Sequence, residues 1–124
     1  VIAADSSTLS ALLLGESGPD VELLAQEMMN GGLRLPPVVM TEILSDAKVA
    51  DLLAPKLSDL ELLDLTDGYW QRAGETRAKL KARGLKANVA DTLIAQSCID
   101  HGVALITRDT DFRHFAKHCG LKLA

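Results

Sequence analysis

The sequence predicts a three-layer α/β/α domain, with helices on both faces of a central, mostly parallel sheet of four or five strands. Short apolar runs without polar alternation are typical of strands buried in a parallel sheet, and they alternate here with longer helical patterns. No hairpin signal joins two of these runs. The chain has 124 residues, of which 48% are hydrophobic, so one compact domain over 1–124 is expected.

The N-terminal half is expected to form a strand over 1–5, helices over 9–14 and 20–30, a strand over 33–35, a helix from 38 to about 53 and a strand over 60–65. The first run is wholly apolar and ends at Asp5. Ser6 and Ser7 are good N-cap residues for the next helix, and glycines end the first two helices. A Pro-Pro pair opens the third helix and Pro55 marks its end.

The C-terminal half is expected to form helices over 68–83 and 89–101, a strand over 103–106, a helix over 111–118 and a strand over 121–123. Gly84 and Gly102 end the two long helices, of which the first is charged and the second apolar. Open α/β sheets bind ligands beyond the carboxyl ends of their strands. Chemistry is therefore expected at those ends.

Several classes of protein are disfavoured by composition. No apolar run approaches the ~20 residues of a membrane-spanning helix, so no membrane partner is expected. The chain does not start with a basic-then-apolar signal segment, which favours a cytoplasmic protein. Its two cysteines, Cys98 and Cys119, form no metal-ligand spacing and are expected to be free thiols.

The net charge of −4 hides an uneven distribution. Residues 1–64 carry eleven acidic and three basic side chains, whereas residues 65–124 carry six acidic and ten basic ones. Such asymmetry can mark a surface that faces a polyanion, and a solvated helix face is the alternative. Six of the basic residues fall within fifteen positions: Arg72, Arg77, Lys79, Lys81, Arg83 and Lys86.

Five acidic residues stand at positions suited to chemistry. Asp5 ends the first strand, and Asp109 and Asp111 follow the 103–106 strand, so these carboxylates should meet at one edge of a parallel sheet. Glu42 and Asp91 lie on largely apolar helix faces, where an unpaired negative charge is unfavourable.

Each acid also has a purely structural interpretation. In the continuous helix expected from 38 to about 53, Glu42 shares a face with Val49 and Leu53, and it could pair with a lysine or arginine. Asp5 could cap a helix, and Asp91 could belong to a capping box begun by Asn88. The acids that follow the 103–106 strand could favour a helix N-terminus through its dipole.

The acids taken as a set favour a metal site. Clustered carboxylates repel one another and need a cation, which the few basic residues of the N-terminal half do not supply. Oxygen ligands suit Mg²⁺ or Mn²⁺, and the absence of a Cys/His pattern disfavours zinc.

Four stretches carry a family resemblance in their order and spacing: the apolar strand into Asp5-Ser6-Ser7, the helical run Val39–Ile43, the helix start Asp91–Ala95, and Leu105–Phe112. Through them the chain resembles the PIN domain family, and within it the VapC-type toxins of toxin–antitoxin pairs. The resemblance covers essentially the whole chain.

The resemblance implies a PIN-like fold and an acidic pocket that binds one or two Mg²⁺ or Mn²⁺ ions. It also implies endonucleolytic cleavage of RNA. Asp5, Glu42, Asp91 and Asp109 match the family's acidic positions, with Asp111 as an accessory metal ligand. The partners implied are RNA, a cognate antitoxin and a second copy of the chain; Trp70 is a candidate for one of the protein contacts.

The expected reaction is hydrolysis of a phosphodiester bond by metal-activated water, which leaves a 5′-phosphate and a 3′-hydroxyl. Glu42 would bind metal or orient the water, and Ser6 and Thr107 would support the acids or the water by hydrogen bonds. The basic stretch and one residue near the acids are expected to contact the RNA backbone: Arg72, Arg77, Lys79, Lys81, Arg83, Lys86 and Arg108.

Two alternatives remain open on sequence alone. The acidic cluster could belong to a binding module without turnover, holding a metal or a partner's arginine. Asp5 could instead be the nucleophile of a metal-dependent phosphatase. That chemistry would favour Asp-x-Asp after the first strand, where this chain has Asp5-Ser6-Ser7.

Overall fold

The computed structural model describes residues 1–124 and contains one sheet of four parallel strands. The strands are β1 (Ile2–Ala4), β2 (Leu33–Leu35), β3 (Glu61–Leu62) and β4 (Ala104–Ile106), in the order β3-β2-β1-β4. The predicted α/β class is therefore confirmed, with every strand pair parallel.

The order of the strands creates a reversal point beside β1. The chain builds outward from β1 through β2 to β3, and then returns to place β4 on the other side of β1. In α/β sheets such a reversal leaves a crevice at the carboxyl ends of the two strands that flank it. Ala4 of β1 is in register with Ile106 of β4, so Asp5 and Thr107 are the first residues beyond that edge.

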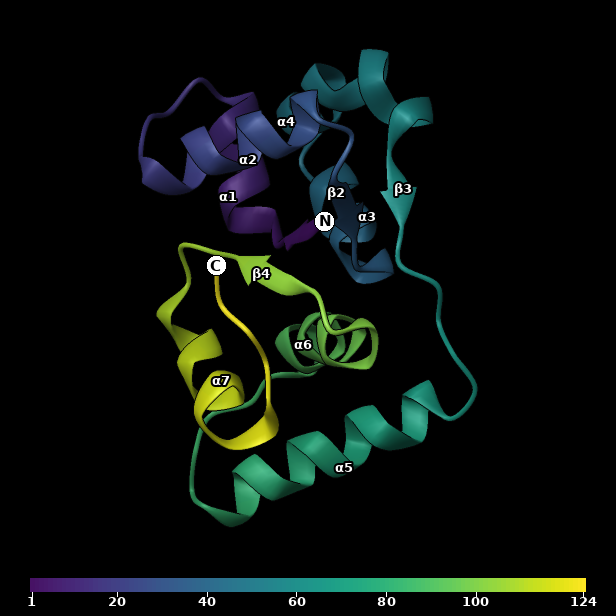
Figure 1. The fold of residues 1–124 in the computed structure, drawn as a ribbon, viewed down its shortest axis with the longest axis vertical. Coiled ribbons are helices and arrows are strands. Elements are labelled where there is room, and N and C mark those ends of the chain that lie inside the picture. Colours follow the sequence, from purple (N-terminus) through teal and green to yellow (C-terminus); the bar gives the residue numbers. More distant parts are fainter.

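Helices cover the sheet in two groups (Figure 1). The helices of the N-terminal half lie together in the upper part of the view: α1 (Ser6–Leu13), α2 (Pro19–Met29), α3 (Pro37–Leu44) and α4 (Ala47–Leu53). The helices of the C-terminal half lie in the lower part: α5 (Tyr69–Ala82), α6 (Val89–His101) and α7 (Arg113–Cys119). Two short 3₁₀ helices, η1 (Ala54–Asp59) and η2 (Thr110–Phe112), complete the elements.

One hydrophobic core joins the sheet to both groups of helices. Ala3 and Ala4 of the central strand are fully buried, as the unbroken apolar run predicts for a strand covered on both faces. Leu9 of α1 and Ile94 of α6 are buried in the same core. The core therefore holds the carboxyl ends of β1 and β4 against helices from both halves of the chain.

The helix expected from 38 to about 53 is wrong as a single element. The structure has two helices there, because the side chain of Asp46 caps α4 by accepting a hydrogen bond from the backbone N–H of Val49 at 3.1 Å. Ser45 donates its hydroxyl hydrogen to the carbonyl of Thr41 at 2.6 Å, at the end of α3. Glu42 thus does not share a continuous helix face with Val49 and Leu53.

Three smaller expectations also need correction. The last predicted strand, 121–123, is only an isolated bridge between Leu123 and Leu105, so the sheet has four strands, the lower of the two expected numbers. The helix expected over 111–118 is divided into η2 and α7. The N-cap of α1 is Asp5 rather than Ser6 or Ser7, because the Asp5 carboxylate accepts the backbone N–H of Thr8.

No helix is both long and apolar enough to span a membrane. Both cysteines are free thiols, as expected, with Cys98 buried in the core and Cys119 half-buried on α7.

Candidate functional site

Asp5 is a buried carboxylate at the reversal point of the sheet. Its side chain accepts hydrogen bonds from the hydroxyls of Thr107 (2.6 Å) and Ser7 (2.7 Å) and from the backbone N–H of Thr8 (3.2 Å). No lysine or arginine pairs with it. Burial raises the pKa of Asp5, the hydrogen bonds oppose that rise, and the negative charge of Asp109 adds to it.

Glu42 projects from α3 toward the same region. The Ser6 hydroxyl donates to its carboxylate at 3.2 Å. The pairing with a basic residue that the sequence left open is absent. Burial raises the pKa of Glu42, and the charge of Asp5 raises it further. Glu42 and Asp5 are therefore electrostatically coupled, although Asp5 follows β1 and Glu42 lies on α3.

Asp91 lies in the first turn of α6, where the N-cap residue Asn88 holds it. The side chain of Asn88 accepts the backbone N–H of Asp91 at 2.7 Å and donates to its carboxylate at 3.0 Å. Burial raises the pKa of Asp91 to about 6; Asp109, and then Asp111 and Glu42, contribute by their charges. The capping role and a functional role are thus compatible, because the cap directs the carboxylate at the other acids.

Asp91, Asp109 and Asp111 form the tightest acidic group. One carboxylate oxygen from each lies within 4.8 Å of the others, and all three residues are half-buried. Asp109 caps η2 by accepting the backbone N–H of Asp111 at 2.8 Å, and this cap keeps the two carboxylates together. The one basic side chain paired with the group is that of Lys86, whose Nζ is 3.2 Å from Asp111.

This acidic arrangement fits a hard divalent cation. All its donors are carboxylate oxygens, which suit Mg²⁺ or Mn²⁺. The raised pKa of Asp91 shows that its negative charge is poorly compensated within the protein. Asp5 lies outside the tightest group, and its oxygens are already engaged by hydroxyl and backbone donors.

The structure divides the basic residues that the sequence predicted for RNA binding. Arg72 of α5 binds Asp100 through two nitrogens, at 2.6 and 3.1 Å, and also donates to the carbonyl of Asp67. The Arg77 Nε donates to the carbonyl of Ala87 at 2.7 Å. The remaining members of α5 and the loop after it are exposed: Lys79, Lys81, Arg83 and Lys86.

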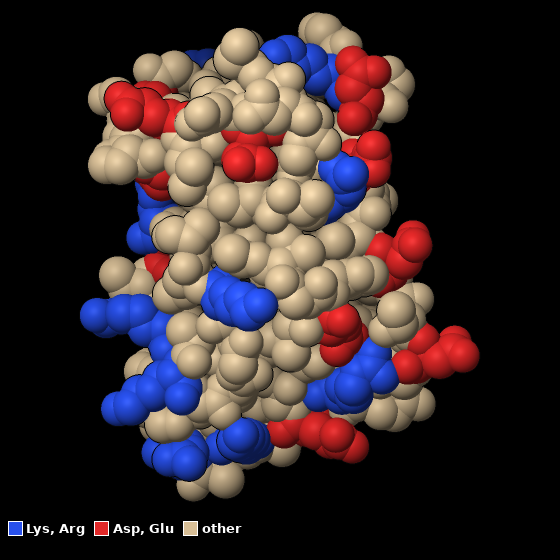
Figure 2. Space-filling model, viewed as in Figure 1, with Lys and Arg blue, Asp and Glu red and all other residues tan.

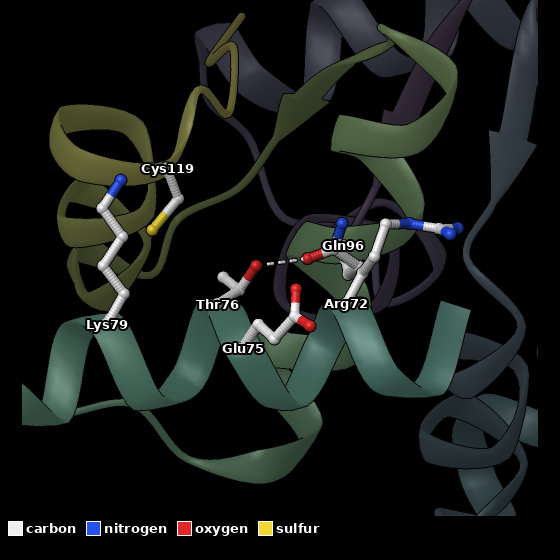
Figure 3. Close-up of a pocket in the computed structure, with 6 residues that line it drawn as sticks. All are labelled: Arg72, Glu75, Thr76, Lys79, Gln96 and Cys119. Atoms are coloured by element: carbon white, nitrogen blue, oxygen red, sulfur yellow. Dashed lines mark hydrogen bonds between the residues drawn. The ribbon is translucent and has the colours of Figure 1, made fainter. Parts of the chain in front are cut away.

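The exposed basic residues form a surface where α5 meets α7. A hollow of about 260 Å³ between α5, α6 and α7 has Arg72 at one end and Lys79 at the other (Figure 3). Lys and Arg side chains gather at the lower left of Figure 2, over α7 and the C-terminal end of α5. Burial, and then the charges of Arg83 and Lys117, lower the pKa of His118 there.

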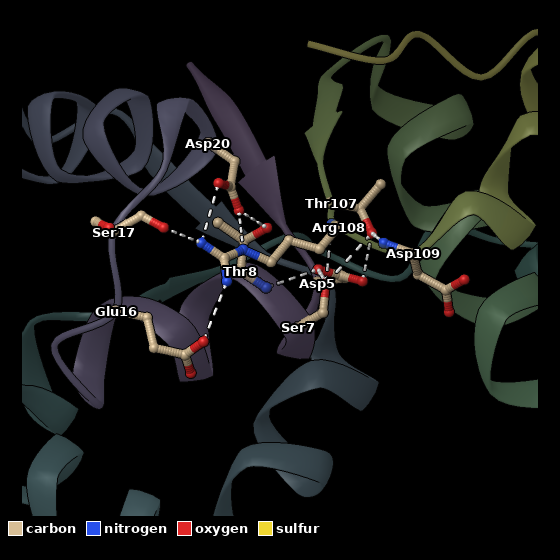
Figure 4. A network of polar contacts seen from close by, with 9 residues as sticks. All are labelled: Asp5, Ser7, Thr8, Glu16, Ser17, Asp20, Thr107, Arg108 and Asp109. Atoms are coloured by element: carbon tan, nitrogen blue, oxygen red, sulfur yellow. Dashed lines mark hydrogen bonds and ion pairs between the residues drawn. The ribbon is translucent and has the colours of Figure 1, made fainter.

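Two features escaped the sequence analysis. The sequence favours Ser7 as a helix-cap residue, whereas in the structure its hydroxyl donates to Asp5 and accepts the backbone N–H of Arg108 at 3.0 Å. The Arg108 side chain turns away from the acidic group and binds Asp20 (Figure 4). The serine two residues after a strand-end aspartate was a usable local signal, whereas nothing local links positions 20 and 108.

Comparison with known proteins supports the architecture. A family model described as the PIN domain matches residues 2–118. The structure is similar to that of VapBC2 from Rickettsia felis bound to a DNA fragment from its promoter, with a TM-score of 0.78 and 20% identity over 99% of this chain and 96% of that one. It is also similar to DNA-bound VapBC from Salmonella typhimurium, with a TM-score of 0.73 and 18% identity over the same shares. Comparison with curated proteins gave no sequence match.

Proposed function

This chain belongs to the PIN domain family, and from that premise we propose that it is a metal-dependent endoribonuclease that acts as the toxin of a toxin–antitoxin pair. One observation carries the proposal: carboxylate oxygens of Asp91, Asp109 and Asp111 lie within 4.8 Å of one another, and these acids are electrostatically coupled to Asp5, which follows β1, and to Glu42 of α3. Four segments far apart in sequence supply these five acids.

Asp91, Asp109 and Asp111 would hold Mg²⁺ or Mn²⁺, as one ion or two. When bound, such an ion supplies water activation and offsets the negative charge that develops on the scissile phosphate. Asp5 and Glu42 extend the negative surface of the site and orient water or a second ion. Thr107 and Ser6 hold those two carboxylates in place by their hydroxyl groups.

RNA is the proposed substrate, and its cleavage would leave a 5′-phosphate and a 3′-hydroxyl. The exposed basic surface of α5 and α7 supports this proposal, because Lys86 connects it to the acidic group through Asp111. Backbone phosphates bound along Lys79, Lys81 and Arg83 would lead toward the carboxylates. An RNA substrate also favours action in the cytoplasm.

The proposed activity is tested by RNA cleavage with Mg²⁺ or Mn²⁺ and with EDTA. Asp91→Asn and Asp5→Asn should each lower the rate more than about a hundredfold, which exceeds the usual effect of losing an outer-shell partner. Circular dichroism should show that both variants remain folded. Asp51→Asn is the matched control, because Asp51 is an exposed aspartate on α4.

The alternatives predict different results in the same experiment. Full cleavage by Asp91→Asn protein would contradict the proposal and indicate a contaminating nuclease. A phosphatase would hydrolyse small phosphomonoesters and form a phosphorylated Asp5. Metal binding without cleavage of any RNA would favour the non-catalytic binding module.

An antitoxin is the proposed protein partner, by analogy with the VapBC complexes of similar structure. An apolar groove of about 640 Å³ lies between α1, α2, β2 and the α4–η1 region and is the surface proposed for this contact. Its lining includes Leu12, Met28, Met29 and Leu52.

A homodimer is proposed as well, with Trp70 as a contact because 63% of its surface is exposed. Analytical ultracentrifugation checks that state, and a monomer at every concentration contradicts it.

A further inference from the structure

Arg108 stands between two residues of the acidic site but directs its side chain elsewhere. Thr107, just before it, donates to Asp5 at 2.6 Å, and Asp109, just after it, belongs to the tightest acidic group. The guanidinium lies on the opposite side of the segment from the Asp109 carboxylate and reaches the connection between α1 and α2 (Figure 4). It is therefore not placed to meet a phosphate bound at the acids.

Four of the five N–H groups of the guanidinium are engaged within the protein. Its Nε and Nη2 bind the two oxygens of Asp20, at 2.6 and 3.2 Å, in the bidentate arrangement that is strongest for arginine and carboxylate. Nη2 also donates to the carbonyl of Ser17 at 2.7 Å, and Nη1 lies 3.3 Å from the Glu16 carboxylate. Each guanidinium nitrogen thus has a partner.

The partner of Arg108 is itself anchored. Asp20 lies in the first turn of α2, where the helix dipole favours a negative charge. It also accepts a hydrogen bond from the hydroxyl of Thr8 at 3.1 Å, and Thr8 is completely buried on α1. Only 31% of the Arg108 side chain and 20% of the Asp20 side chain are exposed, so solvent screens this pair less than an ordinary surface pair.

The backbone at Arg108 is held on its other side. Its N–H donates to the Ser7 hydroxyl at 3.0 Å, and that hydroxyl donates to Asp5. The segment 107–111 carries Asp109 and Asp111 and contains no α-helix or strand, only the 3₁₀ turn of η2. The contacts of Arg108 therefore fix the segment against α1 and α2.

We propose that Arg108 is a positioning residue whose clamp on Asp20 holds the segment 107–111 so that Asp109 and Asp111 face Asp91. This role takes the place of the RNA contact expected for Arg108 from the sequence. The proposal rests on the proposed function in so far as Asp91, Asp109 and Asp111 bind a metal. The integrity of the clamp can be measured without metal.

The test is a double-mutant cycle on Arg108→Ala and Asp20→Asn, with Mn²⁺ affinity measured by calorimetry. Each single variant should weaken Mn²⁺ binding about tenfold, the lower end of outer-shell effects. The double variant should be no weaker than the worse single one, because both changes break one interaction. Arg108→Lys should bind Mn²⁺ nearly as weakly as Arg108→Ala, since lysine cannot form the bidentate pair.

Arg34→Ala is the matched control for a purely structural role. It removes an arginine–glutamate pair of 3.1 Å between β2 and β3, and β1 separates this pair from β4, the strand that leads into segment 107–111. Its Mn²⁺ affinity should equal that of the unmodified protein. Equal weakening by Arg34→Ala and Arg108→Ala would overturn the proposal, because it would show a general loss of stability.

Two further readouts separate the other outcomes. If Arg108→Ala weakens RNA binding in EDTA while Asp20→Asn does not, and Mn²⁺ affinity stays unchanged, Arg108 is an RNA contact and the proposal is overturned. If the unmodified protein binds no Mn²⁺, the proposed function fails, and hydrogen exchange of the amides of 107–111 decides the clamp. Faster exchange in Arg108→Ala supports it, and unchanged exchange overturns it.

Discussion

Asp91 is held by Asn88 on one side and faces the carboxylates of Asp109 and Asp111 on the other. Its pKa of about 6 exceeds the value near 3.9 of an unfolded chain. Between these values the folded state binds the proton more tightly than the unfolded state does. In metal-free protein the free energy of unfolding should therefore fall as pH rises from about 4 to above 6.

Asp91→Asn removes the loss of stability that ionisation of Asp91 causes. At pH 7.5 in EDTA the variant should be more stable than the unmodified protein by about 1 kcal/mol, a value discounted for the partial exposure of the side chain. At pH 4 the difference should vanish, because Asp91 is then protonated in the folded state. Urea denaturation at the two pH values measures both quantities.

Asp100→Asn is a control that should change the stability of the protein in the opposite direction. Its hydrogen bonds from Arg72 lower the pKa of Asp100, so its ionised form stabilises the fold. The asparagine variant should be less stable than the unmodified protein at pH 7.5. A gain in stability for Asp100→Asn, or a loss for Asp91→Asn, would show that these charges do not act as described.

Helices α5 and α7 decide which basic residues are available to a partner. The α5 positions that face α6 bind internal acceptors, as Arg72 does with Asp100. The positions near its C-terminus, Lys79, Lys81 and Arg83, are exposed. The two ends of one helix therefore serve different purposes, although both carry the same kind of charge.

RNA binding should depend on the C-terminal end of α5. In EDTA, the pair Lys79→Ala with Arg83→Ala should weaken RNA binding and reduce the slope of log affinity against log salt by about one to two. The control pair, Lys48→Ala with Lys56→Ala, removes the same charge from exposed sites on α4 and η1. Equal weakening of RNA binding by both double variants would indicate that net charge alone attracts the RNA.

At the scale of the whole molecule, the apolar groove and the acidic site lie on different parts of the fold. The groove is lined from α1, α2, β2 and the α4–η1 region, whereas the tightest acidic group comes from α6 and η2. Met29, at the rim of the groove, exposes 88% of its surface. A mutation in the groove should therefore affect binding of a protein partner without affecting binding of the substrate at the acidic site.

Met29→Glu tests this separation. With a co-expressed antitoxin that binds the unmodified protein as the probe, the variant should yield less co-purified complex than the unmodified protein, because burial of a carboxylate in an apolar contact is unfavourable. RNA cleavage by the free protein should be unchanged. Leu44→Glu places the same charge on an exposed apolar residue of α3 outside the groove and should retain the complex. Loss of the complex in both variants would contradict the proposal that the groove is the contact surface for the partner.

The elements, and the positions of the acids at the strand ends and helix starts, were largely predictable because their signals are local. Strand β2 and helix α6 have the expected bounds, set by the apolar pattern and by Gly102, which takes a left-handed conformation at the end of α6. The division of α3 from α4 was missed although Asp46 is a good N-cap. The continuous apolar periodicity around it outweighed that signal.

The sequence by itself determined a parallel α/β domain with carboxylates after β1 and β4, because strand period and strand ends depend on neighbouring residues. Only the tertiary structure decided which charges are free. Arg108 and Asp20 lie 88 positions apart and pair at 2.6 Å. Arg72 of α5 likewise pairs with Asp100 of α6. Charge type can be read at each position, but the partner of a long side chain is set by packing between distant segments.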